Sequence, residues 1–106
     1  MPSTLRRFEI LLPLQFNDGG DVPTDLLADA VLEIVDHFGA VSYYDNLIRG
    51  HWKHQEIIYR DNNSKIVIDV EDTDENRKWM RDYKARWKEK LDQLDLWLVS
   101  YEIDVE

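Results

Sequence analysis

Apolar and polar side chains alternate near the start of the chain. From Phe8 to Leu14 every second residue is apolar, which predicts a strand over residues 6–16 with one face in the core. The paired glycines, the flanking Asn and Asp and the proline of NDGGDVP then indicate a loop over residues 17–23.

The hydrophobic period then lengthens to that of a helix. A wide apolar stripe runs from Leu26 to Phe38, and acidic residues cover the opposite side. We expect Thr24 or Asp21 to cap the start of this helix through a side-chain oxygen. Gly39 is expected to end it in the left-handed conformation.

After this helix the period returns to two. Strands are predicted over residues 40–52, 57–60 and 65–70, with a turn at 53–56 and a turn or bulge at 61–64. Together these segments predict a long hairpin over residues 41–70, whose distal arm extends past the body of the sheet.

A second helix, with Asp72 or Thr73 as its cap, is predicted to run to about Asp92. Its apolar stripe is rich in aromatic residues, and LDLWLVSYEIDVE at the end of the chain is typical of a strand. We assign three tryptophans of these segments to the core: Trp79, Trp87 and Trp97.

The order β-α-β-β-α-β predicts an α+β fold in a single domain over residues 1–106. The expected plan is ferredoxin-like: an antiparallel sheet with two helices on one face and an extended hairpin arm between the second and third strands. Such a plan leaves the other sheet face uncovered, with Leu11 and Pro13 on it. We therefore expect a homodimer or a protein partner.

Composition narrows the function classes. The chain has no cysteine, which excludes disulfides, a thiolate nucleophile and cysteine-ligated metals. The net charge of −9 disfavours nucleic acids and anionic membranes, and no apolar run is long enough to span a bilayer, so a cytoplasmic protein is expected. Many of the basic residues fall within 77–90, where interleaved acids indicate a solvated helix face. The alternative, a nucleic-acid interface there, predicts affinity that falls steeply with salt.

The stretch IRGHWKHQEIIYRD (48–61) holds the candidate site residues. His51 and His54 are candidate catalytic groups because imidazole titrates near neutral pH, although no nucleophile accompanies them. They lie three apart, so a regular strand turns them to opposite faces, and we expect no metal site and no cofactor. Arg49, Trp52 and Tyr59 are candidate ligand-binding residues. The alternative interpretation is that all of them decorate the hairpin arm.

Pro2 offers a separate possibility. Removal of Met1 would expose its secondary amine, which resembles the catalytic base of the tautomerase superfamily. Here, however, the proline precedes the predicted strand instead of opening it.

Several segments together resemble a family of small bacterial proteins with no assigned activity: FEILLPLQFNDG, FGAVS, IRGHW, IVIDVEDTDEN and LWLVSYEI. The resemblance covers nearly the whole chain. The layout is also similar to that of the dimeric ferredoxin-like α+β barrels, which include small monooxygenases and stress-related enzymes as well as proteins without catalysis.

Two functional hypotheses follow. The first is a non-catalytic interaction or regulatory module, acting as a homodimer through its arm or its second helix. The second is a binder or monooxygenase-like enzyme for a small, aromatic molecule, with a pocket near His51 and His54. The second requires a concave apolar cavity with converging polar groups, whereas the first predicts a filled core and a flat surface.

Overall fold

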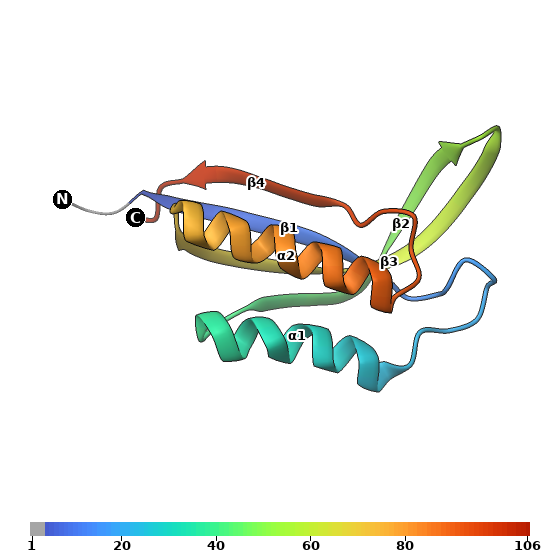
Figure 1. Ribbon diagram of the computed structural model, residues 1–106, viewed down its shortest axis with the longest axis horizontal. Helices are drawn as coiled ribbons and strands as arrows, with labels where there is room; N and C mark the ends of the chain where they lie inside the picture. The colour runs from blue at the N-terminus through green and yellow to red at the C-terminus, as the bar shows by residue number, and fades with distance from the viewer. Residues whose placement is uncertain (1–3) are drawn as a thin grey trace.

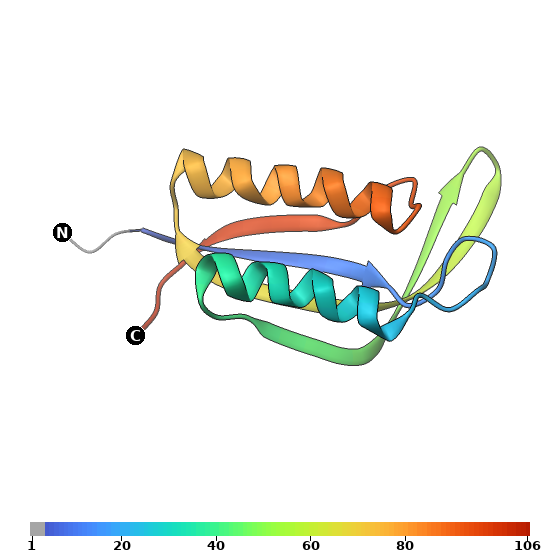
Figure 2. The same cartoon turned by 60° about the horizontal axis from the view of Figure 1, so that its bottom comes forward.

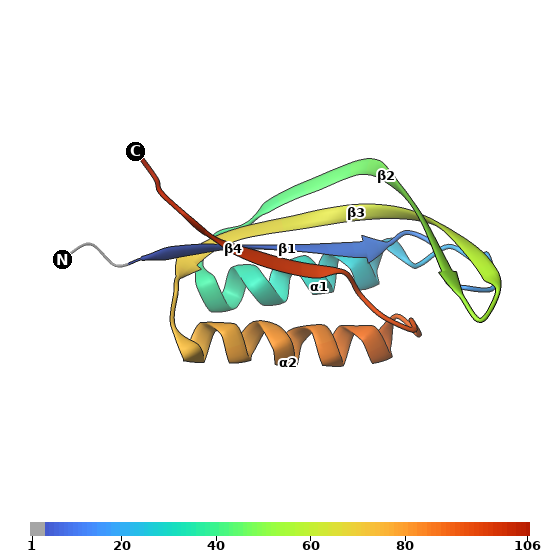
Figure 3. The ribbon, with the colours of Figure 1, turned by 90° about the horizontal axis from the view of Figure 1, so that it is seen from above.

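The computed structural model describes residues 4–106, apart from the side chains of residues 46, 47, 60 and 61. The elements follow in the order β1 (Leu5–Pro13), α1 (Thr24–Phe38), β2 (Ser42–His54), β3 (Ile57–Glu71), α2 (Asp74–Lys90) and β4 (Leu98–Ile103) (Figure 1). The strands pair antiparallel in the sheet order β2-β3-β1-β4. Both helices lie on one face of this sheet (Figure 3).

The core lies between the sheet and the helices. Phe8, Ile10 and Leu12 of β1 are at most 4% exposed and pack with buried residues of both helices. The alternation predicted for the first strand is therefore confirmed. The strand is Leu5–Pro13, however, shorter at its end than predicted, so Leu14 lies beyond it.

Only the C-terminal end of α1 agrees with the prediction from the sequence. Gly39 is left-handed, with φ of 88°, and its N–H donates to the carbonyl of Val35 at 2.7 Å, as predicted. The predicted N-terminal cap is wrong, because Pro23 takes that position and no side chain caps the helix. Thr24 is instead the first helical residue, and the Asp21 carboxylate accepts a hydrogen bond from Gln15.

The start of α2 agrees with one of the two caps predicted for it. Thr73 is the cap, because its side-chain oxygen accepts a hydrogen bond from the N–H of Asn76 at 3.0 Å. Asp72 instead forms an ion pair with Arg77.

The β2–β3 hairpin turns at Gln55 and Glu56, inside the predicted turn, with positive φ at both residues. The predicted turn or bulge at 61–64 is wrong, because β3 continues through it. Polar side chains are accommodated there by hydrogen bonds, such as that from the Ser64 hydroxyl to the carbonyl of Leu12. The irregularity falls in β2, where the register with β3 shifts between Tyr44 and Ile48.

The distal half of this hairpin, which we call the arm (residues 48–63), leaves the plane of the sheet and bends away from its body (Figures 1 and 2). The molecule consequently measures 49 Å along its longest axis, against 30 Å and 24 Å along the other two. The predicted extended arm is present.

One tryptophan assigned to the core is not there. Trp87 is 2% exposed and Trp79 packs against the core, but Trp97 is 66% exposed. Leu98 stands opposite Ile10 and takes the inward position on β4, so alternation turns the preceding residue to the outer sheet face. Ion pairs such as Arg7–Asp69 and Lys65–Glu9 also lie on that face, which is more polar than the sequence indicated.

Candidate ligand-binding cavity

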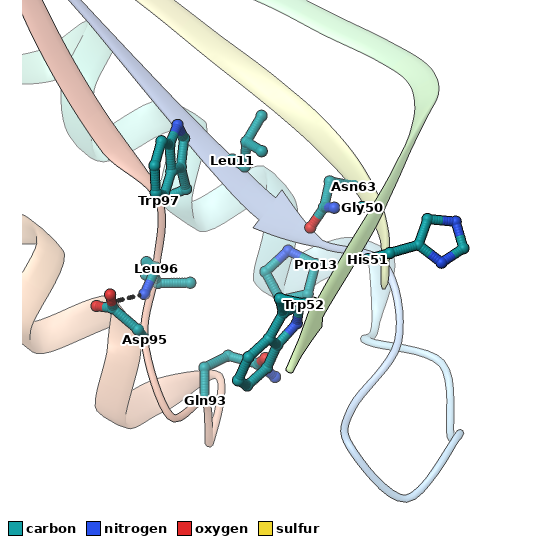
Figure 4. A pocket seen from close by; sticks show the side chains of 10 residues that line it. All are labelled: Leu11, Pro13, Gly50, His51, Trp52, Asn63, Gln93, Asp95, Leu96 and Trp97. Carbon is teal, nitrogen blue, oxygen red and sulfur yellow. Dashed lines mark hydrogen bonds between the residues drawn. The ribbon is translucent and has the colours of Figure 1, made fainter. Parts of the chain in front are cut away.

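A cavity of about 400 Å³ opens where the arm meets the end of β1 and the segment between α2 and β4 (Figure 4). We call it the arm-base cavity. Its lining residues are Leu11, Pro13, Gly50, His51, Trp52, Asn63, Gln93, Asp95, Leu96 and Trp97.

Strand alternation determines which side chains reach this cavity. Leu11 and Pro13 are at odd positions of β1, so their side chains lie on the opposite face of the strand from the core residues Phe8, Ile10 and Leu12. On β2, Gly50 and Trp52 are two residues apart and therefore share one face. The wall from the α2–β4 segment is tied to β1 by a hydrogen bond from the N–H of Leu11 to the carbonyl of Trp97 at 3.0 Å.

Aromatic rings form two of the walls. Trp52 is half-buried and stacks on Tyr59, its cross-strand neighbour, with ring centroids 4.4 Å apart and an interplanar angle of 16°. This stacking limits the orientations open to the indole, which is part of the cavity lining. Trp97, on a different element, supplies the second aromatic wall.

Polar groups interrupt the apolar lining at three places. The side-chain amide of Asn63, which is 7% exposed, donates to the carbonyl of Ile48 at 3.3 Å. The amide of Gln93 donates to the carbonyl of Leu91, at the end of α2, at 2.8 Å. Both amides are therefore held in place by backbone carbonyls. Asp95 supplies a carboxylate at the rim.

The Asp95 carboxylate is ionised at neutral pH. Partial burial raises its pKa, but hydrogen bonds from Lys84 and from the N–H of Leu96 outweigh this, and the net shift of the pKa is downward. The rim of the cavity therefore carries a paired carboxylate.

The structure brings together only some of the residues that the sequence singled out. Trp52 lines the cavity, and Tyr59 supports it from behind. His51 belongs to the lining, but its imidazole points away from the cavity (Figure 4). Arg49 is exposed and His54 lies near the tip of the arm; neither is in the lining. The catalytic assignments therefore stay predictions, and Pro2 lies outside the described residues.

Sequence reasoning missed the polar wall. Asn63 was interpreted as part of a turn, Asp95 was placed in the final strand, and Gln93 fell between that strand and the second helix. The available signal was a polar run, DNNS, between two apolar strand segments, which is unusual in a continuous strand.

The basic residues of α2 are largely neutralised by acids. Arg77, Lys78, Lys84 and Arg86 form ion pairs with Asp72, Asp82, Asp95 and Glu33, respectively. A more open hollow of about 680 Å³ beside this helix is lined by equal numbers of basic and acidic residues: Arg81, Lys84, Lys88, Glu89, Asp92 and Asp95, with Ala85 and Gln93.

Metal-binding residues do not gather in the described part of the chain, where no group of three His, Cys, Asp or Glu side chains could hold an ion. No helix among the described residues is long and apolar enough to cross a membrane.

No protein-family model and no curated protein matches the chain, so the family resemblance seen in the sequence stays a prediction. Solved structures do match. A phage SAM lyase in complex with S-methyl-5'-thioadenosine is similar with a TM-score of 0.70 and 14% identity, over 100% of this chain and 94% of that one.

Two CutA proteins are also similar in structure, and the first of them is a divalent ion tolerance protein. CutA1 from Ehrlichia chaffeensis has a TM-score of 0.63 at 4% identity, over 100% of this chain and 87% of that one. CutA from Synechococcus elongatus PCC7942 has a TM-score of 0.61 at 9% identity, over 96% and 79%. At these identities the likeness shows the fold alone: an α+β protein with helices on one face of a curled antiparallel sheet, resembling the CutA1 fold.

Proposed function

We propose that the protein binds a small planar molecule in the arm-base cavity. The observation that supports this is an unfilled cavity of about 400 Å³ between two tryptophans from separate elements. Ligand sites are typically apolar clefts of about 300–1,000 Å³ with a few fixed polar groups. Of the two hypotheses from the sequence, the ligand-binding one required such a cavity.

The fold neighbours suggest which probe to use first. The element order and the sheet order β2-β3-β1-β4 support our assignment of the chain to the ferredoxin-like arrangement, which many unrelated functions share. One neighbour, the phage SAM lyase, holds S-methyl-5'-thioadenosine. A nucleoside has the planar ring that two tryptophan walls could accept, so adenosine is a suitable probe.

The experiment is a calorimetric titration of adenosine into the wild type and into Trp97→Ala. Because stacking of a base on an aromatic ring contributes about 1–3 kcal/mol, the variant should bind at least about fivefold more weakly. Leu94→Ala is the matched control, since Leu94 is also exposed in the same segment but does not line the cavity. Absence of saturable binding, or equal binding by Trp97→Ala, would exclude the proposal.

Self-association is a second candidate function, and the tip of the arm favours it. Ile57 and Ile58 are 55% and 66% exposed there, and Tyr101 on the outer sheet face is 43% exposed. These apolar side chains support a homodimer, the interaction module expected from the sequence. Light scattering over a range of protein concentrations tests it. A mass of one chain at every concentration would refute it, and a dimer that Ile58→Asp dissociates would support it.

A further inference from the structure

We propose that the arm-base cavity selects planar ligands that donate hydrogen bonds, such as an amino-substituted heteroaromatic ring, neutral or cationic. This inference rests on the proposed function and names its ligand class. It is based on the polar atoms of the lining that make no hydrogen bond to other described residues.

Asn63 supplies the most deeply buried of these atoms. The carbonyl of Ile48 can only accept a hydrogen bond, so the Asn63 amide must turn its Nδ2 toward that carbonyl. Its Oδ1 is thereby turned the other way, toward the cavity (Figure 4). Within the described residues no donor reaches this oxygen. This oxygen is not among the fully buried, unpaired atoms of the described residues, so it is open to the cavity, where a ligand N–H can reach it.

The same reasoning applies to the side-chain amide of Gln93. Its Nε2 donates to the carbonyl of Leu91, and this bond leaves Oε1 as the free end of the amide. The Asp95 carboxylate turns toward α2 instead, where Lys84 binds its Oδ1 at 3.1 Å (Figure 4). Two side chains of the wall, Asn63 from β3 and Gln93 from the segment between α2 and β4, thus offer oxygen acceptors to a ligand.

The lining lacks the groups that an anion would need. No lysine or arginine is among its described residues, and the His51 imidazole points away. A carboxylate or phosphate would meet the amide oxygens of Asn63 and Gln93 with no cationic side chain in the lining to compensate it. A ring carbonyl in place of an amino group would set one acceptor against another.

Adenosine and inosine test this selectivity, because inosine has a carbonyl acceptor in place of the exocyclic amino group of adenosine, and its remaining base donor is the single N1–H. We expect the wild type to bind adenosine at least about tenfold more tightly than inosine in calorimetric titrations. Equal binding, or tighter binding of inosine, would overturn the inference and leave the proposed function standing. Binding of neither nucleoside would remove both.

Variants of two neighbouring asparagines locate the effect. Asn63→Ala should lower the adenosine-to-inosine preference by about threefold or more. Asn62→Ala is the matched control, because the Asn62 amide donates to Gln15 and does not line the cavity. An unchanged preference in Asn63→Ala, with a native circular dichroism spectrum, would also overturn the inference. If that variant fails to fold, the comparison of the two nucleosides on the wild type decides alone.

Discussion

Tyr83 joins the two helices at the centre of the core. Its side chain has no exposed surface, and its hydroxyl donates to the carbonyl of Ala30, on α1, at 2.7 Å. Burial raises the pKa of this phenol well above its ordinary value, with a smaller contribution from the Glu33 carboxylate, so the hydroxyl stays a donor under physiological conditions. A polar group has thus been buried together with its partner.

Removing this hydroxyl should weaken the protein measurably. We expect Tyr83→Phe to lower the free energy of unfolding by about 1 kcal/mol, because the bond to Ala30 is lost inside the core. Urea denaturation provides the measurement. The exposed Tyr43 donates no hydrogen bond among the described residues, so Tyr43→Phe should change the stability by less than about 0.5 kcal/mol. Equal effects of the two substitutions would contradict the expectation.

Asp72 gives a prediction that depends on pH. Hydrogen bonds from Arg77 and the neighbouring charge of Arg6 lower its pKa from 3.8 to about 2. A carboxylate with a depressed pKa in the folded state stabilises the protein above its unfolded pKa and loses this contribution as the pH falls through the folded value. The melting temperature of the wild type should therefore exceed that of Asp72→Asn at about pH 6, and the difference should shrink between about pH 4 and pH 2.

The comparison of these two proteins isolates Asp72, since other carboxyl groups titrate in both. Asp104→Asn, in the exposed segment after β4, should match the wild-type melting temperature at both ends of the range. If the difference in melting temperature between the wild type and Asp72→Asn stays constant down to about pH 2, the stability that Asp72 contributes does not depend on its charge.

At the scale of single residues, the sequence could predict which side chains alternate between the faces of a strand, but not which residues the fold brings together in the cavity. Trp52 was predicted as a ligand-binding residue, and it does line the cavity. Asn63 and Trp97 were interpreted wrongly because a polar residue in a strand and an exposed tryptophan both break the usual pattern. Each reaches the cavity through contacts between segments that are distant in the sequence, which no local period encodes.

The elements were more predictable, because each strand and helix repeats its own pattern several times. The shift in the ladder is the exception. Tyr44 pairs with Lys65 and Ile48 with Asn63, so β2 advances by more residues than β3 does there. A bulge can occur in either strand of a hairpin. The polar residues of 61–64 led us to predict it in β3, whereas it occurs in β2.

The turn of the arm is strained in a way that a substitution can test. Gln55 and Glu56 have φ of 49° and 66°, values that glycine and asparagine adopt more readily than glutamine or glutamate. The double substitution Gln55→Asn and Glu56→Gly should stabilise the arm by about 1 kcal/mol. Amide hydrogen exchange should slow about fivefold in the flanking strands. Glu56→Val, with a branched side chain at a positive φ, should speed exchange, and the opposite order would contradict this account.

For the whole molecule, the net charge is strongly negative, and many of the basic residues lie on α2, where four of them pair with acids. The chain carries −9, and the cations of α2 are largely engaged by acids of the same or neighbouring elements. The field at the arm-base cavity should therefore favour a cationic ligand over a neutral one of the same shape, in addition to the acceptors of its wall.

Ionic strength separates this long-range effect from the contacts inside the cavity. The Debye length shortens from tens of ångströms at low salt to about 10 Å at 0.1 M, so the affinity for a cationic planar amine such as 9-aminoacridine should fall severalfold between about 20 and 300 mM NaCl. The affinity for adenosine, which is neutral, should change by less than about twofold. Calorimetric titrations of both ligands at each salt concentration give the measurement. An equal salt dependence of the two would show that the negative charge of the molecule does not reach the cavity, and selection would then depend on the hydrogen-bond acceptors alone.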